Sequence, residues 1–98
     1  MKNIVIIATI KVKDGFKDEV YNELVKLHKA THELDEGCIQ YDLHKDLADE
    51  NSFTFVETWQ SAGFLVLHEE KEHFKTFVSN IENKIDGLTI NKLEKLDI

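Results

Sequence analysis

The stretch from Asn3 to Val12 is apolar on both of its sides, and this limits the possible folds more than any other feature. Alternate residues of a strand point to opposite faces, and here both faces carry isoleucine, with alanine and valine on one and valine and threonine on the other. The many β-branched residues favour a strand over a helix. Such a strand is expected inside a sheet, with cover on each face.

The length and charge of the chain limit what it can be. Its 98 residues suit one domain with one core, so we predict a single domain over residues 1–98. The net charge of −7, with lysines interleaved among acidic residues, repels phosphates and argues against nucleic-acid binding. No apolar run approaches the roughly 20 residues of a membrane span. Cys38 is the only cysteine, which excludes an intrachain disulfide and indicates a reducing cytoplasm.

Two segments follow whose apolar spacing differs. Phe16–Leu34 repeats its apolar residues with the period of a helix, and Gly37 can end that helix with a positive φ angle. Cys38–Lys45 and Ser52–Trp59 instead alternate apolar and polar residues, which predicts two strands joined as a hairpin by the polar loop Asp46–Asn51.

The second half predicts another helical region and a last strand. Ser61 is a good N-cap for a helix that includes Phe64–His68, and a second helical stripe runs from Phe74 to Ile85. These form one helix or two pieces broken around Glu70–Glu72. Asp86 and Gly87 are expected to turn the chain into a strand over Leu88–Leu96. The order βαββαβ predicts an α+β, ferredoxin-like fold, with a four-stranded antiparallel sheet and both helical regions on one face.

The other face of that sheet has no helix to cover it. Because strand Asn3–Val12 is apolar there as well, an uncovered face would be prone to aggregation. A second copy of the chain, packed face to face about a two-fold axis, is the simplest cover. We therefore predict a homodimer that forms a dimeric α+β barrel.

The candidate site residues lie in the second half of the chain. His68 and His73 sit among apolar residues and are the predicted catalytic groups, since histidine titrates near neutral pH. Glu57 shares a strand face with Phe55 and Trp59, so a buried Glu57 would need a partner and its pKa would rise. Trp59 is either a large residue of the core or dimer interface or a flat wall for an aromatic ligand. Together with Tyr41, Phe55 and Glu57 it is our candidate for binding the substrate.

Metal, phosphate and acyl chemistry have no motif here. The segment HEEKEH differs from HExxH because its second histidine, His73, comes one residue late, and five positions do not share a helical face. No third ligand is evident, so we expect no metal and no cofactor. The chain also lacks a glycine-rich phosphate loop and a Ser-His-Asp or Cys-His arrangement.

Three segments, taken in order, resemble one known family: GCIQYDLHKD from Gly37, FTFVETWQS from Phe53, and LHEEKEHFKTFV from Leu67. The chain is similar to the antibiotic biosynthesis monooxygenase (ABM) domains, and especially to small quinol-monooxygenase-like members. The resemblance implies a dimeric α+β barrel with one pocket per subunit. It also implies a monooxygenase that oxidises a small phenolic, quinol-like or other aromatic substrate with O2 and without metal or flavin, with His68 or His73 as base.

The resemblance leaves other activities to weigh. Haem-degrading relatives need an asparagine on the first strand, a tryptophan near position 68 and a haem-ligating histidine near position 78. This chain has Ala8, His68 and Val78 there. Another branch isomerises a phosphorylated sugar, so an isomerase of a small carbonyl compound is one alternative. A dimer that binds a small ligand without catalysis is the other.

Overall fold

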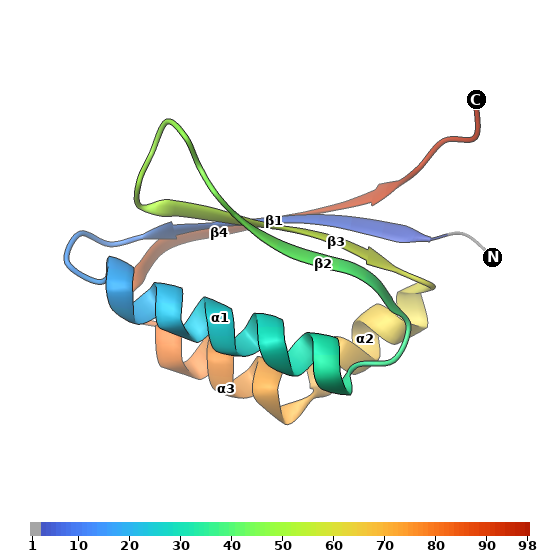
Figure 1. Ribbon diagram of the computed structural model, residues 1–98, viewed down its shortest axis with the longest axis horizontal. Coiled ribbons are helices and arrows are strands. Elements are labelled where there is room, and N and C mark those ends of the chain that lie inside the picture. Colours follow the sequence, from blue (N-terminus) through green and yellow to red (C-terminus); the bar gives the residue numbers. More distant parts are fainter. Residues whose placement is uncertain (1–2) are drawn as a thin grey trace.

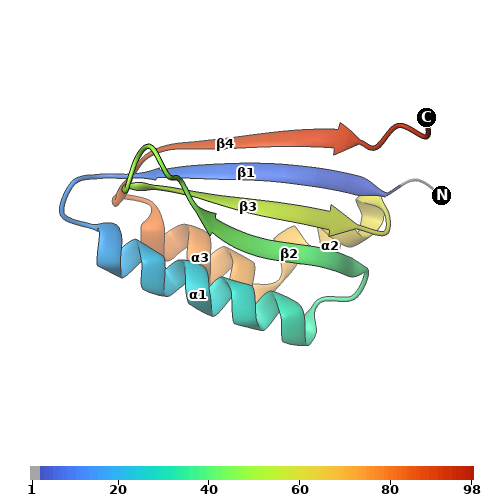
Figure 2. The same ribbon diagram turned by 45° about the horizontal axis from the view of Figure 1, so that its top comes forward.

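The computed structural model describes residues 3–98, so the first two residues of the predicted 1–98 domain lie outside it. A four-stranded antiparallel sheet forms one layer, and helices cover one of its faces (Figure 1, Figure 2). The strand order is β2-β3-β1-β4. The elements are, in chain order, β1 (Ile4–Val12), α1 (Lys17–Leu34), β2 (Cys38–Lys45), β3 (Ser52–Trp59), α2 (Ala62–Glu70), α3 (Glu72–Ile81) and β4 (Ile85–Glu94). The predicted ferredoxin-like α+β fold is confirmed.

The two central strands place their apolar residues on the helix-covered face. In the antiparallel register of β1 and β3, Ile6 lies opposite Glu57 and Ala8 lies opposite Phe55. All four side chains are buried beneath the helices. The alternation seen in the sequence thus gives the side of each residue correctly, because successive residues of a strand alternate between faces.

Helix α1 packs against the sheet with the stripe that the periodicity predicts. Its buried residues recur every three or four positions; they are Val20, Leu24, Leu27 and Thr31. The helix ends at Leu34, and Gly37 follows with a φ angle of +76°. A Cβ atom at Gly37 would lie 2.2 Å from Cγ of Phe64, so glycine is required there both for its backbone angle and for space.

The helical region after β3 consists of two helices rather than one. The side chain of Ser61 accepts a hydrogen bond from the backbone N–H of Phe64 and so caps α2, as predicted. The backbone of Lys71 is extended, with φ −69° and ψ 147°, and it separates α2 from α3. The break falls between Glu70 and Glu72, inside the segment where the sequence allowed it.

The end of the chain differs from the sequence prediction. Helix α3 ends at Ile81 rather than near Ile85, and β4 begins at Ile85 rather than at Leu88. The chain turns at residues 82–84, where the backbone N–H of Lys84 donates to the carbonyl of Ile81. The turn predicted at Asp86 and Gly87 is wrong. Strand β4 pairs with the whole of β1, so its first residues must already be extended.

The face of the sheet away from the helices is apolar and uncharged at its centre. Its side chains come from all four strands, and are Gln40, Asp42 and His44 of the edge strand β2 together with Val5, Ile7, Thr9, Thr54, Val56, Thr58, Thr89, Asn91 and Leu93. Ile7 and Val56 face each other across the β1–β3 pair and are only half-buried. Among residues 3–98, no helix is long and apolar enough to cross a membrane.

Candidate active site

Three ionisable side chains from three separate helix ends meet at one point. Asp35 directly follows α1, His68 lies in the last turn of α2, and His73 lies in the first turn of α3. The Asp35 carboxylate contacts both histidines, and its side chain is only 1% exposed. The break at Lys71 makes this possible, because it lets two histidines five positions apart approach the same carboxylate.

His68 is held from one side and faces a cavity on the other. Its Nδ1 forms a short hydrogen bond with Oδ2 of Asp35, and its Nε2 lies 3.5 Å from the hydroxyl of Tyr41. Burial lowers the pKa of His68, although the nearby Asp35 carboxylate opposes that shift. The bond to Asp35 favours the tautomer with its proton on Nδ1, so the lone pair is on Nε2. There it accepts the long hydrogen bond from the Tyr41 hydroxyl, and it can accept a substrate proton when that bond opens.

His73 makes a looser contact with the same carboxylate. Its Nε2 lies 2.8 Å from Oδ1 of Asp35, with 16% of its side chain exposed. Within residues 3–98, neither atom has a partner in hydrogen-bond alignment, so the contact is mainly electrostatic. A protonated His73 would therefore help to hold Asp35 in place.

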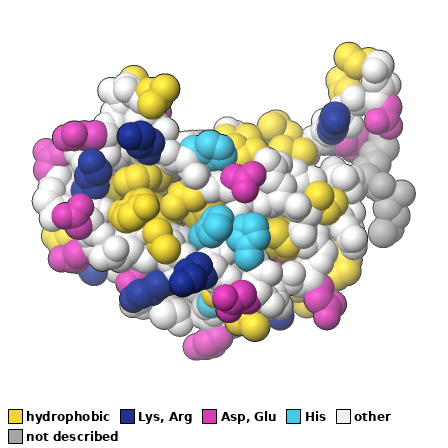
Figure 3. Space-filling view, in the orientation of Figure 1, with side chains coloured by type: hydrophobic (Ala, Val, Ile, Leu, Met, Phe, Trp, Pro, Cys, Tyr) yellow, Lys and Arg dark blue, Asp and Glu magenta, His cyan; other side chains and the backbone are white. Residues whose placement is uncertain are grey.

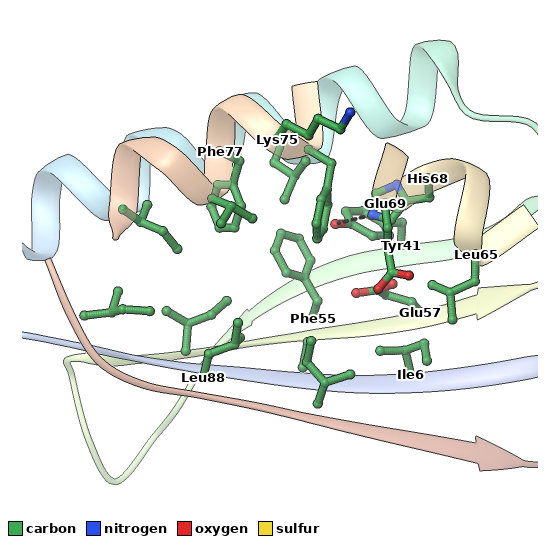
Figure 4. Close-up of a pocket in the computed structure, with 18 of the residues that line it drawn as sticks. Ile6, Tyr41, Phe55, Glu57, Leu65, His68, Glu69, Lys75, Phe77 and Leu88 are labelled. Carbon is green, nitrogen blue, oxygen red and sulfur yellow. Dashed lines mark hydrogen bonds between the residues drawn. The ribbon is translucent and has the colours of Figure 1, made fainter. Parts of the chain in front are cut away.

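Glu57 is a second titratable group beside His68. It is only 5% exposed, and its Oε1 accepts a hydrogen bond of 2.9 Å from the indole N–H of Trp59. Burial raises the pKa of Glu57 to about 7. The bond from Trp59 opposes that shift, and the charge of Glu69 adds to it. The carboxyl groups of Glu57 and Glu69 both point toward the space below His68 (Figure 4).

His68, Glu57 and Glu69 line one end of a cavity between the helices and the sheet, which has a volume of about 600 Å³. Tyr41, Phe55 and Phe77 form much of its apolar wall, and Leu88 of β4 lines the side next to that strand (Figure 4). Ile90 of β4 also lines the cavity. Burial raises the pKa of Tyr41 well above its usual 10, so the hydroxyl of Tyr41 remains protonated and can donate a hydrogen bond. An apolar cavity with a few convergent polar groups is typical of a small-molecule site.

Comparison with known proteins places this arrangement in a family. The model of the family described as antibiotic biosynthesis monooxygenase matches residues 3–80. The chain belongs to the antibiotic biosynthesis monooxygenase family. It is 36% identical, over 76 residues, to a Bacillus subtilis (strain 168) protein provisionally named monooxygenase YcnE; the match covers 78% of this chain and 79% of YcnE.

Solved structures agree with the family assignment. The protein PA3566 from Pseudomonas aeruginosa superimposes with a TM-score of 0.91 at 32% identity, covering 99% of this chain and 97% of PA3566. A protein from Methanosarcina mazei Go1 gives a TM-score of 0.90 at 29% identity, covering 98% of this chain and 95% of its own. The ABM fold therefore extends over nearly the whole chain.

The ABM domain brings together all six residues predicted for the site, but in different positions. His68, Tyr41, Phe55 and Glu57 line the cavity. Trp59 lies behind them: it is fully buried, donates to Glu57 and packs against the His68 ring at 4.6 Å between centroids. His73 is also outside the lining and reaches the site through Asp35.

Sequence reasoning missed Asp35 in this ABM domain. The residue follows the helical segment Phe16–Leu34, and no motif there marks it as part of a site. Its position held one clue, since a carboxylate at the C-terminal end of a helix is disfavoured by the helix dipole and therefore calls for a cationic partner. Asp35 is also the third possible metal ligand, which the sequence did not show beside His68 and His73. The three residues offer ligand atoms within 4.8 Å of one another. A second group with this spacing comprises His28, His32 and Asp42.

Proposed function

We propose that this chain is a cofactor-independent monooxygenase that oxidises a phenolic or quinol-like small molecule with O2. The observation that carries the proposal is His68, which is held by Asp35 through Nδ1 and turns Nε2 toward an apolar cavity beside Tyr41. Family membership supports oxygenase chemistry in general, and this geometry supports a phenolic substrate because it supplies a base inside an apolar pocket.

In the proposed reaction, His68 Nε2 takes the proton of a substrate hydroxyl. The phenolate gives one electron to O2, and the resulting radical pair combines to form a carbon–oxygen bond at the para ring carbon. The peroxide anion so formed takes the proton back from His68. The resulting hydroperoxide loses water together with the para hydrogen, and the para carbon becomes a carbonyl group. One oxygen atom of O2 thus enters the quinone product and the other leaves as water, so phenol plus O2 gives quinone plus H2O.

Each nearby group has a role in that sequence. Asp35 stabilises the imidazolium that forms when His68 accepts the proton, as the carboxylate of a catalytic triad does. The protonated Tyr41 hydroxyl, and Glu57 when protonated, can donate hydrogen bonds to the substrate oxygen as negative charge develops on it. The aromatic wall at Phe55 suits a planar ring.

The test is O2 consumption with a phenol whose para carbon bears hydrogen, followed by detection of ¹⁸O from ¹⁸O2 in the product. We expect His68→Gln to lower kcat by about 10²–10⁴-fold. His44→Gln, at an exposed histidine on β2, is the matched control and should keep the wild-type rate. Wild-type turnover no faster than autoxidation of the phenol would refute the proposal.

An isomerase of a small carbonyl compound is the second candidate, and Glu57 is the observation in its favour. Proton transfer between two carbons needs a base and an acid, which a neutral His68 and a Glu57 with a pKa of about 7 would provide. Turnover in the absence of O2 would distinguish this reaction from oxygenation. The third alternative, ligand binding without catalysis, predicts binding of phenols with no turnover in either assay.

We also propose that the chain acts as a homodimer through the uncovered face of its sheet. This face has Ile7 and Val56 at its centre, and Leu93 at its margin is 48% exposed. Most of the other side chains on β1, β3 and β4 are threonine, and the charge of Asp42 lies on the edge strand β2. Packing centred on β1 can therefore join two copies without burying that charge. Sedimentation as a monomer at micromolar concentration would contradict this.

A further inference from the structure

A cluster of histidines lies outside the cavity, on the surface formed by α1 and β2. His28 and His32 are one helical turn apart on α1, and their ring centroids are 4.3 Å apart. Asp42 of β2 approaches them, so that each of the three residues offers one ligand atom within 4.8 Å of the others. Histidine side chains gather at the centre of the face shown in Figure 3, close to an acidic side chain.

The hydrogen bonds around this cluster prepare two of its members for a metal. His32 Nε2–H donates a hydrogen bond of 2.8 Å to the backbone carbonyl oxygen of Tyr41. That bond fixes the tautomer in which Nδ1 of His32 carries the free lone pair, as in the outer shell of many zinc sites. The Asp42 carboxylate is held likewise, since the side-chain amide of Gln40 donates to its Oδ2 at 2.9 Å. Oδ1 of Asp42 remains available.

Access distinguishes this cluster from the buried one. In the Asp35 group, both histidines already contact the carboxylate, and Asp35 and His68 are almost completely buried. A metal there would have to break the existing hydrogen bond between Asp35 and His68. His32 and Asp42, in contrast, are exposed, and His28 is half-buried beside them. Their side chains can rotate to close the remaining distance around an ion.

We propose that His28, His32 and Asp42 form a binding site for a divalent transition metal ion of the Zn²⁺ class. Two imidazoles and one carboxylate suit Zn²⁺, Ni²⁺ or Cu²⁺, and exclude the oxygen-seeking Mg²⁺ and Ca²⁺. Water would complete the coordination. The site is independent of the proposed oxidation, because none of its three residues lines the cavity.

The ion would also join α1 to β2 next to the active site. His32 is bonded to the backbone of Tyr41, the residue whose hydroxyl approaches His68. Binding at this cluster would therefore hold the strand segment that carries Tyr41 against α1. Because only the folded chain brings His28 and Asp42 together, Zn²⁺ should raise the Tm of the protein.

The test is titration of untagged full-length protein with Zn²⁺ by isothermal calorimetry. We expect one ion per chain with micromolar affinity, and a weakening of more than about tenfold in the double variant His28→Gln/His32→Gln. Asp42→Asn should also weaken binding. His44→Gln and His73→Gln are the controls: the first removes another exposed histidine, and the second disrupts the buried cluster. Both should bind Zn²⁺ as the wild type does.

A second measurement uses the wild-type protein alone and does not depend on the folding of any variant. Substoichiometric Zn²⁺ should shift the side-chain NMR resonances of His28 and His32 while leaving those of His68 in place. The proposal is overturned if Zn²⁺ up to about 1 mM does not bind. It is also overturned if the double variant binds like the wild type, or if His73→Gln removes binding.

Discussion

The charge of Glu57 should destabilise the folded protein at alkaline pH, and Glu57→Gln should relieve that. In the folded chain the pKa of Glu57 is raised from 4.5 to about 7, chiefly by burial. Between these two values the folded state binds a proton that the unfolded state has lost. The contribution of Glu57 to stability is therefore fully present below about pH 4.5 and is lost as the pH rises through about 7.

The size of the effect follows from the shift. One pKa unit corresponds to about 1.4 kcal/mol, so a shift from 4.5 to about 7 amounts to about 3–4 kcal/mol at most. Glutamine has the shape of glutamic acid, carries no charge, and its amide oxygen can still accept the indole N–H of Trp59. We expect Glu57→Gln to raise the free energy of unfolding by about 2 kcal/mol at about pH 8.5, and to leave it nearly unchanged at about pH 4.5.

Urea unfolding followed by tryptophan fluorescence measures this difference, since Trp59 is the only tryptophan and is fully buried. Both proteins are compared at one protein concentration, so that any dimer contributes equally. Other groups that titrate in this range cancel in the comparison. Glu50→Gln, at an exposed glutamate, is the matched control and should show no pH-dependent gain. A Glu57→Gln effect of the same size at both pH values would refute the reasoning.

Three further predictions concern the site, the fold and the dimer. Asp35→Asn should lower kcat by about 10²–10⁴-fold with little change in KM, because His68 loses the carboxylate that stabilises its imidazolium; an unchanged kcat in steady-state kinetics would contradict this. Gly37→Ala should lower the free energy of unfolding by about 3 kcal/mol, since its φ is +76° and a Cβ would overlap Phe64; a denaturation midpoint like that of the wild type would be inconsistent with it. Ile7→Lys should convert the dimer to a folded monomer in analytical ultracentrifugation, whereas Glu33→Lys on the exposed side of α1 should not; a dimeric Ile7→Lys protein would exclude the sheet face as the interface.

The alternation of apolar residues was enough to predict strands β1 and β3 and the side chains of each that share one face. It works for β1 and β3 because each has one face under the helices, where a change of register would expose every buried residue. It failed at the start of β4, an edge strand whose residues are mostly exposed and so carry little pattern. There, Asp86 and Gly87 look like a turn although they lie within the strand.

The candidate site was predictable only in part, for a related reason. Phe55 and Glu57 could be assigned together because a strand fixes which side chains share a face. Asp35 could not be assigned, since its burial depends on α2 and α3 closing over the end of α1, and no local pattern reports that packing. Trp59 is predicted to bind the substrate, whereas in the structure it lies behind Glu57, outside the cavity lining, and that position depends on how α2 lies against β3.

The extended residue Lys71 makes the length of its segment matter more than its composition. The exposed neighbours Glu70 and Glu72 touch nothing in the site, so exchanging their side chains should be tolerated. Removing or adding a residue there would instead change where α3 begins relative to α2 and carry His73 away from Asp35. Among relatives, this segment should therefore vary freely in sequence while keeping a constant number of residues between the two histidines.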